Sequence, residues 1–193
     1  MKNKDKIVRL TTVAILAALV VILQMIASSI RIGPVSISLV LIPIVVGAAL
    51  HGPYAGAVLG LVFAAVAIYG EAMGGMFWAI SIPGTIAICT VKGVCCGAAA
   101  GLVYKLFEKK DRTAAAFAAA VTCPIVNTGL FLVGCFTLFS SALDGWALAA
   151  GYATVIKFIL VGIICTNFIP ELLINVLLSP AIVTIIKNAR KAH

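Results

Sequence analysis

The distribution of charged residues is the feature that most constrains how this chain can fold. Fourteen of its twenty charged residues lie in three short stretches, at residues 1–9, 105–112 and 187–193. Between them run uncharged segments that can cross the roughly 30 Å hydrocarbon core of a bilayer, which takes about 20 helical residues. Only 10% of the chain is charged, against about 25% in a typical soluble domain. The chain is therefore predicted to be an integral membrane protein.

The uncharged segments predict an all-α membrane protein with six transmembrane helices in a single domain, residues 1–193. Residues 32–70 are too many for one crossing, and Gly52-Pro53 divides them, because helices often end at Gly and restart with Pro. The last segment is long enough to require tilt or a bend near Pro170. The six predicted helices cover residues 10–30, 35–50, 53–70, 78–104, 114–139 and 153–186.

Lys and Arg residues in the short loops predict the orientation in the membrane. With six helices, both termini and the 105–112 loop share one side, which then carries eleven basic residues. The other side carries Arg31, Glu71 and Asp144. Basic loops stay in the cytoplasm, so both termini are predicted to be cytoplasmic. The net charge of +8 is interpreted as this topology signal together with contact to anionic lipid, rather than as nucleic-acid binding.

Residue types suited to catalysis or metal binding are scarce. The six cysteines fall within predicted spans without CxxC spacing, which favours a role as small apolar fillers. His51 and His193 are the only histidines, so a zinc or histidine-based catalytic site is hard to build. No GxxxxGK[ST] phosphate loop occurs. We predict no metal, no cofactor and no enzymatic activity, ATP hydrolysis included.

Small residues recur at four-residue spacing in three of the predicted helices. These ridges consist of Ala14 and Ala18; Gly52, Gly56 and Gly60; and Gly93, Gly97 and Gly101. In lipid, such ridges let two backbones approach closely and gain dispersion contacts. The ridge at 93–101 is interpreted as packing within the chain. Ala14 and Ala18 lie on a terminal helix with fewer internal neighbours, so they predict contact with a partner protein.

Polar residues inside predicted helices are the candidate functional residues, because each is costly in lipid unless it is paired or lines a cavity. They concentrate in the last three helices. The candidate substrate-binding residues are Lys157, Asn127, Ser81, Thr85, Trp78 and Asn167. Alternatives are extension to outer lipid headgroups for Lys157 and an interhelical hydrogen bond for Asn127. Lys92 and Glu171, of opposite charge and similar depth, are predicted to form a structural ion pair.

Four short segments carry a resemblance to a known family: residues 14–18, 37–47, 51–57 and 123–129. Their order and spacing, with the length near 190 residues, resemble the substrate-binding S components of energy-coupling factor (ECF) vitamin transporters. The resemblance implies a multi-pass protein of the bacterial cytoplasmic membrane that binds a water-soluble vitamin with high affinity. It implies as partners a transmembrane coupling subunit, contacted by Ala14 and Ala18, and two ATPases. The outer loops and last three helices would enclose the ligand.

The identity of the substrate stays open at this point. A carboxylate-bearing vitamin such as pantothenate is favoured, because Lys157 can pair with a carboxylate. Riboflavin comes next, since it would need an aromatic slot, for which the chain offers Phe77, Trp78 and Trp146. The alternative function is a stand-alone, proton-coupled exporter of small molecules, with Glu71 or Glu171 as the proton carrier.

Overall fold

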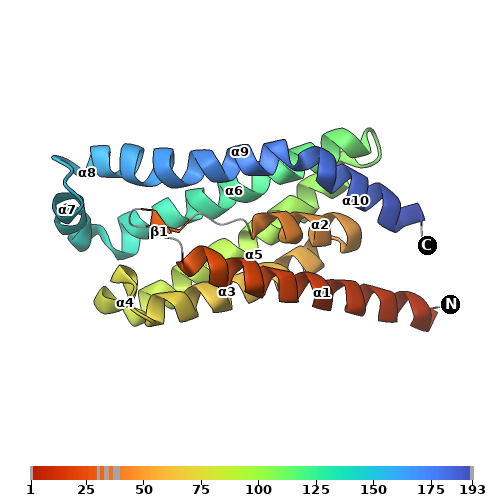
Figure 1. The fold of residues 1–193 in the computed structure, drawn as a ribbon, viewed down its shortest axis with the longest axis horizontal. Coiled ribbons are helices and arrows are strands. Elements are labelled where there is room, and N and C mark those ends of the chain that lie inside the picture. The colour runs from red at the N-terminus through yellow and green to blue at the C-terminus, as the bar shows by residue number, and fades with distance from the viewer. Residues whose placement is uncertain (1, 30, 33–34, 37–39, 192–193) are drawn as a thin grey trace.

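The computed structural model describes residues 2–29, 31–32, 35–36 and 40–191. Most of this part of the chain is helical, and the long helices run side by side along the long axis of the molecule (Figure 1). Among the described residues, five helical segments are long and apolar enough to cross a membrane. They are α1 (Lys2–Ser29), α3 (Pro53–Ala72), α5 (Ile82–Phe107), α6 (Arg112–Leu138) and the segment Val155–Leu177. The predicted all-α membrane fold is confirmed.

Shorter elements complete the fold. The shorter helices are α2 (Leu41–His51), α4 (Met76–Ile80), α7 (Ser140–Ala149) and α10 (Ser179–Lys191). Strands β1 (Arg31–Ile32) and β2 (Val35–Ser36) pair antiparallel. In Figure 1, α1 begins and α10 ends at the same end of the molecule, where the α5–α6 connection also lies. We call this the basic end; α4 and α7 lie at the opposite end.

The second predicted crossing is not a full span. Helix α2 has 11 residues, so it covers about 16 Å, or roughly half of the bilayer core. The predicted helix at 35–50 is wrong in its first part, because Val35 and Ser36 belong to a hairpin strand. Six full-length crossings are therefore not present in the described chain.

Most other helix boundaries lie close to the predicted ones. Gly52 ends α2 with φ at 87°, a conformation that suits glycine, and Pro53 opens α3. Asp111 precedes α6, and its carboxylate accepts a hydrogen bond from the Thr113 N–H at 2.7 Å. The predicted division at Gly52-Pro53 is thus confirmed.

The last membrane segment contains the largest departure from regular helix. It consists of α8 (Val155–Lys157), the π-helix η1 (Phe158–Phe168) and α9 (Ile169–Leu177). Pro170, the second residue of α9, has no N–H and cannot close a helical hydrogen bond to the preceding turn. The π-helix, which has a wider turn than an α-helix, lies immediately before α9. The chain bends between α9 and α10 (Figure 1), at Leu178, and Pro180 lies in the first turn of α10, where its missing N–H needs no helical partner. The predicted single helix at 153–186 is therefore two segments.

Two rows of glycine form the closest contact between long helices. A Cβ atom added to Gly56 would clash with the Gly97 carbonyl, and one added to Gly60 would clash with the Gly93 carbonyl. The reverse additions on α5 would meet the α3 carbonyls in the same way. The two backbones can lie so close only because glycine has no side-chain carbon. The interpretation of the 93–101 ridge as internal packing is confirmed.

Buried apolar side chains gather in two clusters along the long axis. The first cluster, nearer the basic end, includes Leu41, Leu59, Phe63, Cys96, Tyr104, Ala119, Cys123 and Ile182. The second, which we call the aromatic cluster, includes Phe77, Ile88, Cys89, Phe131, Cys135, Phe139, Leu143, Phe158 and Ile163. On α6 and α9, the buried residues between the two clusters include the polar residues Asn127, Thr128, Glu171 and Asn175.

We predict that Gly60→Ala destabilises the protein, because the added methyl group would overlap the Gly93 carbonyl and separate α3 from α5. Overpacking of this kind costs about 1–3 kcal/mol, measurable by thermal unfolding in detergent. The control is Gly129→Ala on α6, where an added Cβ meets nothing within 4 Å. Alanine favours helix over glycine, so the control keeps or gains stability. Equal losses in both variants would contradict the glycine contact.

Candidate functional site

A layer of polar side chains separates the two apolar clusters. It consists of Lys92 on α5, Asn127 and Thr128 on α6, and Glu171 and Asn175 on α9. Lys92 is partly buried and the other four are buried, with Glu171 only 1% and Asn175 0% exposed. Polar groups in this position are costly in a membrane unless they are paired or bind something. We call these five residues the polar layer.

Glu171 is the centre of the polar layer. The Asn127 side chain lies close enough to interact with its carboxylate. The Asn175 side-chain amide donates to the backbone carbonyl of Glu171 at 2.8 Å. Lys92 lies close enough to interact with the carboxylate through its charge. These interactions connect α5, α6 and α9 at one level of the bundle.

The predicted direct ion pair between Lys92 and Glu171 is not among the salt bridges of the described side chains. The Lys92 ammonium lies 5.0 Å from the ring centroid of Phe131 and 5.6 Å from that of Phe63. A cation over aromatic faces is attracted by about 0.5–2 kcal/mol. The ammonium therefore lies over the rings and attracts the Glu171 carboxylate across a longer distance.

Three buried oxygens of the polar layer have no hydrogen-bond partner among the described residues. They are Asn127 Oδ1, Glu171 Oε1 and Asn175 Oδ1. Buried polar atoms of this kind normally bond to protein, water or a ligand, because an unmade bond is costly. All three are acceptors. The polar layer can therefore receive the N–H or O–H groups of a small polar molecule.

An aromatic group adjoins the polar layer on the side of α4 and α7. The Phe77 ring meets Phe131, Phe139 and Trp146 edge-on, with centroid distances of 5.4, 5.2 and 4.7 Å. Phe131 also faces the Lys92 ammonium, so it belongs to both regions. Phe77 and Trp146 were among the aromatic residues predicted from the sequence. Phe131 and Phe139 were missed, since isolated phenylalanines in an apolar helix give no signal that separates core from site.

Ser81 and Thr85, two of the predicted substrate-binding residues, lie at the start of α5 and have local hydrogen bonds. The Ser81 hydroxyl accepts a bond from the Gly84 N–H at 3.2 Å and so caps the helix. The Thr85 hydroxyl donates to the Ser81 carbonyl at 2.8 Å and is fully buried. These bonds give both residues a structural role, and their contact with substrate stays a prediction.

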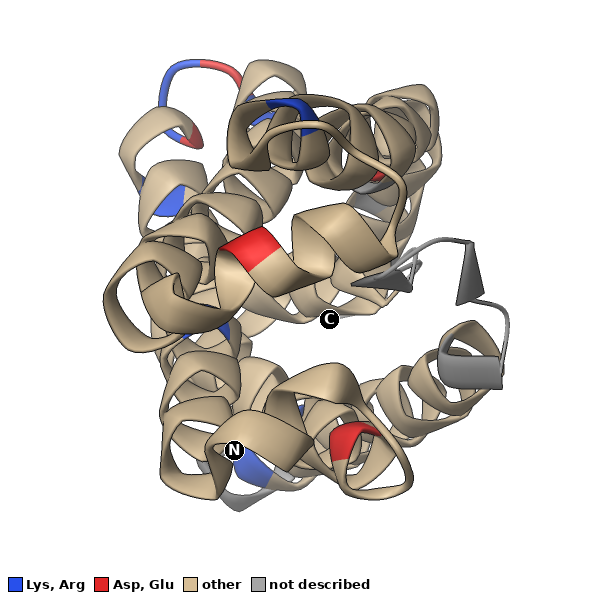
Figure 2. Cartoon of the chain, turned by 90° about the vertical axis from the view of Figure 1, so that its left-hand side faces the viewer, with Lys and Arg blue, Asp and Glu red and all other residues tan. Residues whose placement is uncertain are grey.

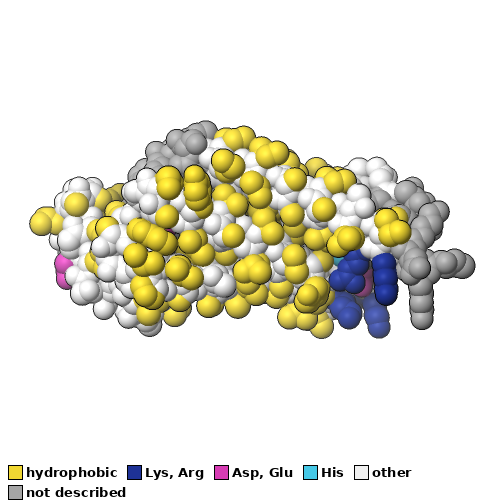
Figure 3. All heavy atoms as spheres, turned by 90° about the horizontal axis from the view of Figure 1, so that it is seen from below, with side chains coloured by type: hydrophobic (Ala, Val, Ile, Leu, Met, Phe, Trp, Pro, Cys, Tyr) yellow, Lys and Arg dark blue, Asp and Glu magenta, His cyan; other side chains and the backbone are white. Residues whose placement is uncertain are grey.

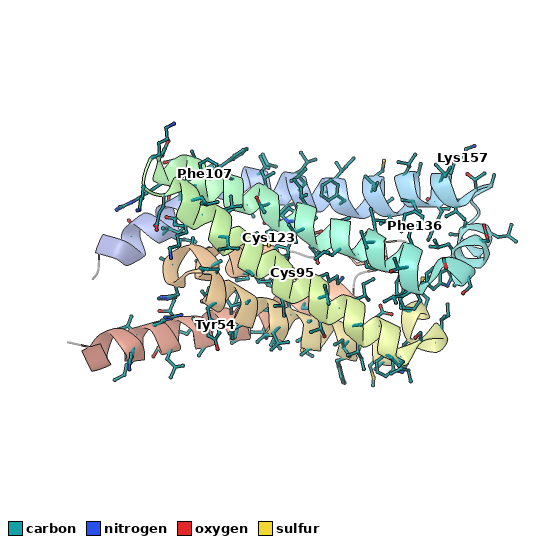
Figure 4. All side chains as sticks on the ribbon, turned by 180° about the vertical axis from the view of Figure 1, so that it is seen from behind. Tyr54, Cys95, Phe107, Cys123, Phe136 and Lys157 are labelled. Carbon is teal, nitrogen blue, oxygen red and sulfur yellow. The ribbon has the colours of Figure 1, made fainter. Side chains whose placement is uncertain are left out.

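The remaining predicted binding residues lie outside the polar layer. Trp78 is partly buried on α4, next to Phe77 of the aromatic group. Lys157 is exposed and points away from the bundle in Figure 4, a position that suits the alternative in which it reaches lipid headgroups. The Asn167 side chain lies outside the described part of the structure, although its backbone belongs to η1. Asn127 is thus the predicted binding residue that the fold brings into the layer.

Two buried polar residues were not among the predicted substrate-binding residues, although helical spacing in the sequence puts Asn175 on the same face as Glu171. Asn175 lies one helical turn after Glu171, and this spacing is a signal that the two share a helix face. Gln24 on α1 is 3% exposed, although the first three helices were predicted to be almost purely apolar. A single glutamine in an apolar span is itself a signal, because its amide is costly in lipid.

Many side chains of α1 are exposed on the surface of the described structure. Ala14 and Ala18 are both exposed, and so are the flanking Ile15 and Leu19. The spanning part of α1 has the smallest buried share of the five candidate spans. An apolar helix face of this kind contacts lipid or a partner protein, and the partner contact of Ala14 and Ala18 stays a prediction.

Comparisons with known proteins identify one family. Residues 8–183 match a family model described as ECF transporter, substrate-specific component. The match covers the polar layer, the aromatic group and both alanines of α1. The chain has no significant match among curated proteins or among solved structures.

We predict that Lys92 and Glu171 are energetically coupled across the polar layer. Removing one buried charge strands the other, which costs about 3–5 kcal/mol, whereas replacing both by apolar residues is nearly neutral. Thermal unfolding in detergent should therefore show Lys92→Met and Glu171→Met strongly destabilised and the double variant largely recovered. Lys157→Met, at an exposed position, serves as the control with little effect. A double variant that loses the sum of the single losses would show that the two charges do not interact.

Proposed function

The chain belongs to the family of substrate-specific components of ECF transporters, and from this we propose that it is the high-affinity binding subunit of an importer for a water-soluble vitamin. The observation that carries the proposal is the polar layer, whose buried acceptor oxygens lack partners among the described residues. A protein whose only task is to pack helices in lipid gains nothing from such atoms. A protein that binds a polar molecule inside the membrane requires them.

We propose that the basic end faces the cytoplasm and that the end with α4 and α7 faces outward. Lys and Arg side chains gather at one end in Figure 3, beyond a broad hydrophobic band. The opposite end faces the viewer in Figure 2, and Asp144 lies there on α7. The positive-inside rule supports this orientation, with both termini in the cytoplasm of a bacterial cell. Substrate would then reach the polar layer past the aromatic group.

The polar layer also bears on the chemistry of the substrate. Asn127, Glu171 and Asn175 offer acceptor oxygens, so the bound part of the substrate should carry hydroxyl or N–H groups. Pantothenate has hydroxyl and amide groups in addition to its carboxylate, and stays the first candidate. Riboflavin is the second, because the aromatic group could stack against its ring system. Lys157 is left as the candidate partner of a substrate carboxylate at the outer mouth.

We propose that transport requires other subunits. The sequence lacks a nucleotide-binding phosphate loop, and membership of the family implies association with ECF transmembrane and ATPase subunits. In this proposal a transmembrane coupling subunit contacts α1 and two ATPases supply the energy. The chain itself binds substrate and catalyses no reaction.

A proton-coupled exporter is the second candidate function. The observation that favours it is Glu171, a carboxyl buried within a membrane segment, since such groups often belong to proton pathways. Transport by the lone protein that follows a proton gradient would support this candidate. ATP-dependent uptake that appears only with the partner subunits would exclude it.

We predict that variants in the polar layer weaken substrate binding. Small molecules released from the purified protein should be identified by mass spectrometry, and pantothenate and riboflavin titrated by calorimetry. Asn127→Ala or Asn175→Ala removes one acceptor, a loss of about 1–3 kcal/mol, or roughly 5- to 150-fold in affinity. Thr137→Ala, exposed on the same helix as Asn127, is the control.

The same titrations decide the role of the polar layer and of Lys157. Unchanged affinity in folded Asn127→Ala and Asn175→Ala proteins would make the layer structural, even if a vitamin binds elsewhere. Lys157→Ala should lower affinity for pantothenate and not for riboflavin if it pairs with the substrate carboxylate. Unchanged affinity for both would assign Lys157 to the lipid headgroups.

We predict that the exposed alanines of α1 are required for assembly and not for binding. Ala14→Leu and Ala18→Leu add bulk to the proposed contact surface, so copurification with a coexpressed coupling subunit should be lost while substrate affinity is kept. Ala87→Leu places the same bulk on an exposed position of α5 and is the matched control. Lost affinity with intact assembly would show that Ala14 and Ala18 do not form the partner contact.

A further inference from the structure

A groove lies between α1 and α3 near the basic end, apart from the polar layer. Its volume is about 430 Å³. The residues that line it include Lys6, Arg9, Leu10 and Val13 of α1 and Tyr54 and Val58 of α3. Because α1 and α3 are both membrane-spanning helices that start near this end, the groove opens at the edge of the bilayer.

The lining of the groove divides into a cationic part and an apolar part. Lys6 and Arg9 are three residues apart on one helix, so they share a face, and both are exposed. Leu10 and Val13 follow them toward the middle of the membrane segment, and Val58 lies across from them on α3. The groove therefore offers two positive charges at its headgroup side and an apolar floor toward the hydrocarbon core.

Tyr54 marks the level of the membrane boundary. It is the second residue of α3 and is 74% exposed, and Figure 4 places it on the side of α3 that faces α1. Tyrosine is enriched at the membrane–water interface, because its ring is apolar and its hydroxyl is polar. Its position indicates that the groove crosses from the headgroup region into the hydrocarbon region.

We propose that this groove binds an anionic phospholipid, with the phosphate between Lys6 and Arg9 and one acyl chain along Leu10, Val13 and Val58. Charge complementarity supports this occupant, since clustered Lys and Arg next to a membrane segment attract anionic lipid. The apolar floor distinguishes a lipid from free phosphate, which would gain nothing from it. The proposal does not depend on which molecule the polar layer binds.

The lipid and the proposed coupling subunit would use different faces of α1. At about 100° per residue, the groove residues of α1 centre about 110° around the helix from Ala14 and Ala18. Both faces can therefore be occupied at once. A lipid in the groove would fill the space between α1 and α3 at the basic end and hold α1 in position there.

The test is native mass spectrometry of the purified full chain with phosphatidylglycerol or phosphatidylcholine of identical acyl chains. We expect phosphatidylglycerol to bind more tightly, and the Lys6→Gln/Arg9→Gln variant to lose about tenfold of that affinity. The matched control is Lys109→Gln/Lys110→Gln, which removes two exposed cations at the same end outside the groove and should bind as the parent does. Equal losses in both double variants would mean general electrostatic attraction and overturn the proposal.

A second variant tests the apolar part without changing charge. Val58→Trp fills the groove, so phosphatidylglycerol binding should fall although Lys6 and Arg9 remain, and inorganic phosphate should not compete with the lipid. Competition by inorganic phosphate would show that the acyl chain is not recognised and overturn the proposal. Unchanged lipid binding by Val58→Trp, together with lost copurification of the coupling subunit, would assign the groove to that partner instead.

Discussion

The close approach of α3 and α5 at their glycine rows is the contact on which the rest of the structure depends. Gly60 and Gly93 meet at their backbones, so the rotation of α5 about its axis is set at this point. Lys92 precedes Gly93, and Phe63 lies one turn after Gly60, which places the Lys92 ammonium over the Phe63 ring. The opposite side of α5 then packs on α6, where Phe131 provides the second ring. The close approach of the glycine backbones of α3 and α5 therefore determines where the Lys92 ammonium lies in the polar layer.

The polar layer can exist because apolar clusters close the bundle on both sides of it. In this low-dielectric surrounding, hydrogen bonds and charge interactions are stronger than in water, and an unmade bond is more costly. The Asn127 side chain interacts with the Glu171 carboxylate, while oxygens of Asn127, Glu171 and Asn175 keep acceptor capacity that no described residue takes up. These acceptor oxygens are the feature on which the proposal of a polar substrate rests, and the chain belongs to a family of substrate-specific transport components.

The short length of α2 also bears on the polar layer, because residues 31–32 and 35–36, which precede it, form strands β1 and β2 and not a helix. Where a sixth full span would pass, the described chain has the β1–β2 hairpin, and β2 lies beside η1. Non-helical backbone at membrane depth is tolerated where it is buried in protein or lines a polar cavity, because lipid cannot satisfy its hydrogen bonds. The π-helix η1 adds a second irregular segment at this level, and such segments are frequent at functional sites. Irregular backbone and the buried polar layer thus occur in the same half of the molecule, while α1 keeps a smooth apolar face outward.

The sequence by itself determined the membrane class, the division at Gly52-Pro53, the glycine ridges and the presence of Asn127, Lys92 and Glu171 inside helices. These features depend on composition, on charge-free length and on spacing along one helix, all of which are local. Only the tertiary structure decided that α2 is half a span, that Lys92 contacts aromatic rings instead of Glu171, and that Lys157 is exposed. It also showed that Asn175, which spacing alone puts on the Glu171 face, is fully buried, and it added Gln24 to the buried polar residues. The physical reason is that sequence spacing tells which residues share a helix face, whereas the rotation and depth of each helix are set by contacts with other helices, such as the glycine contact of α3 and α5.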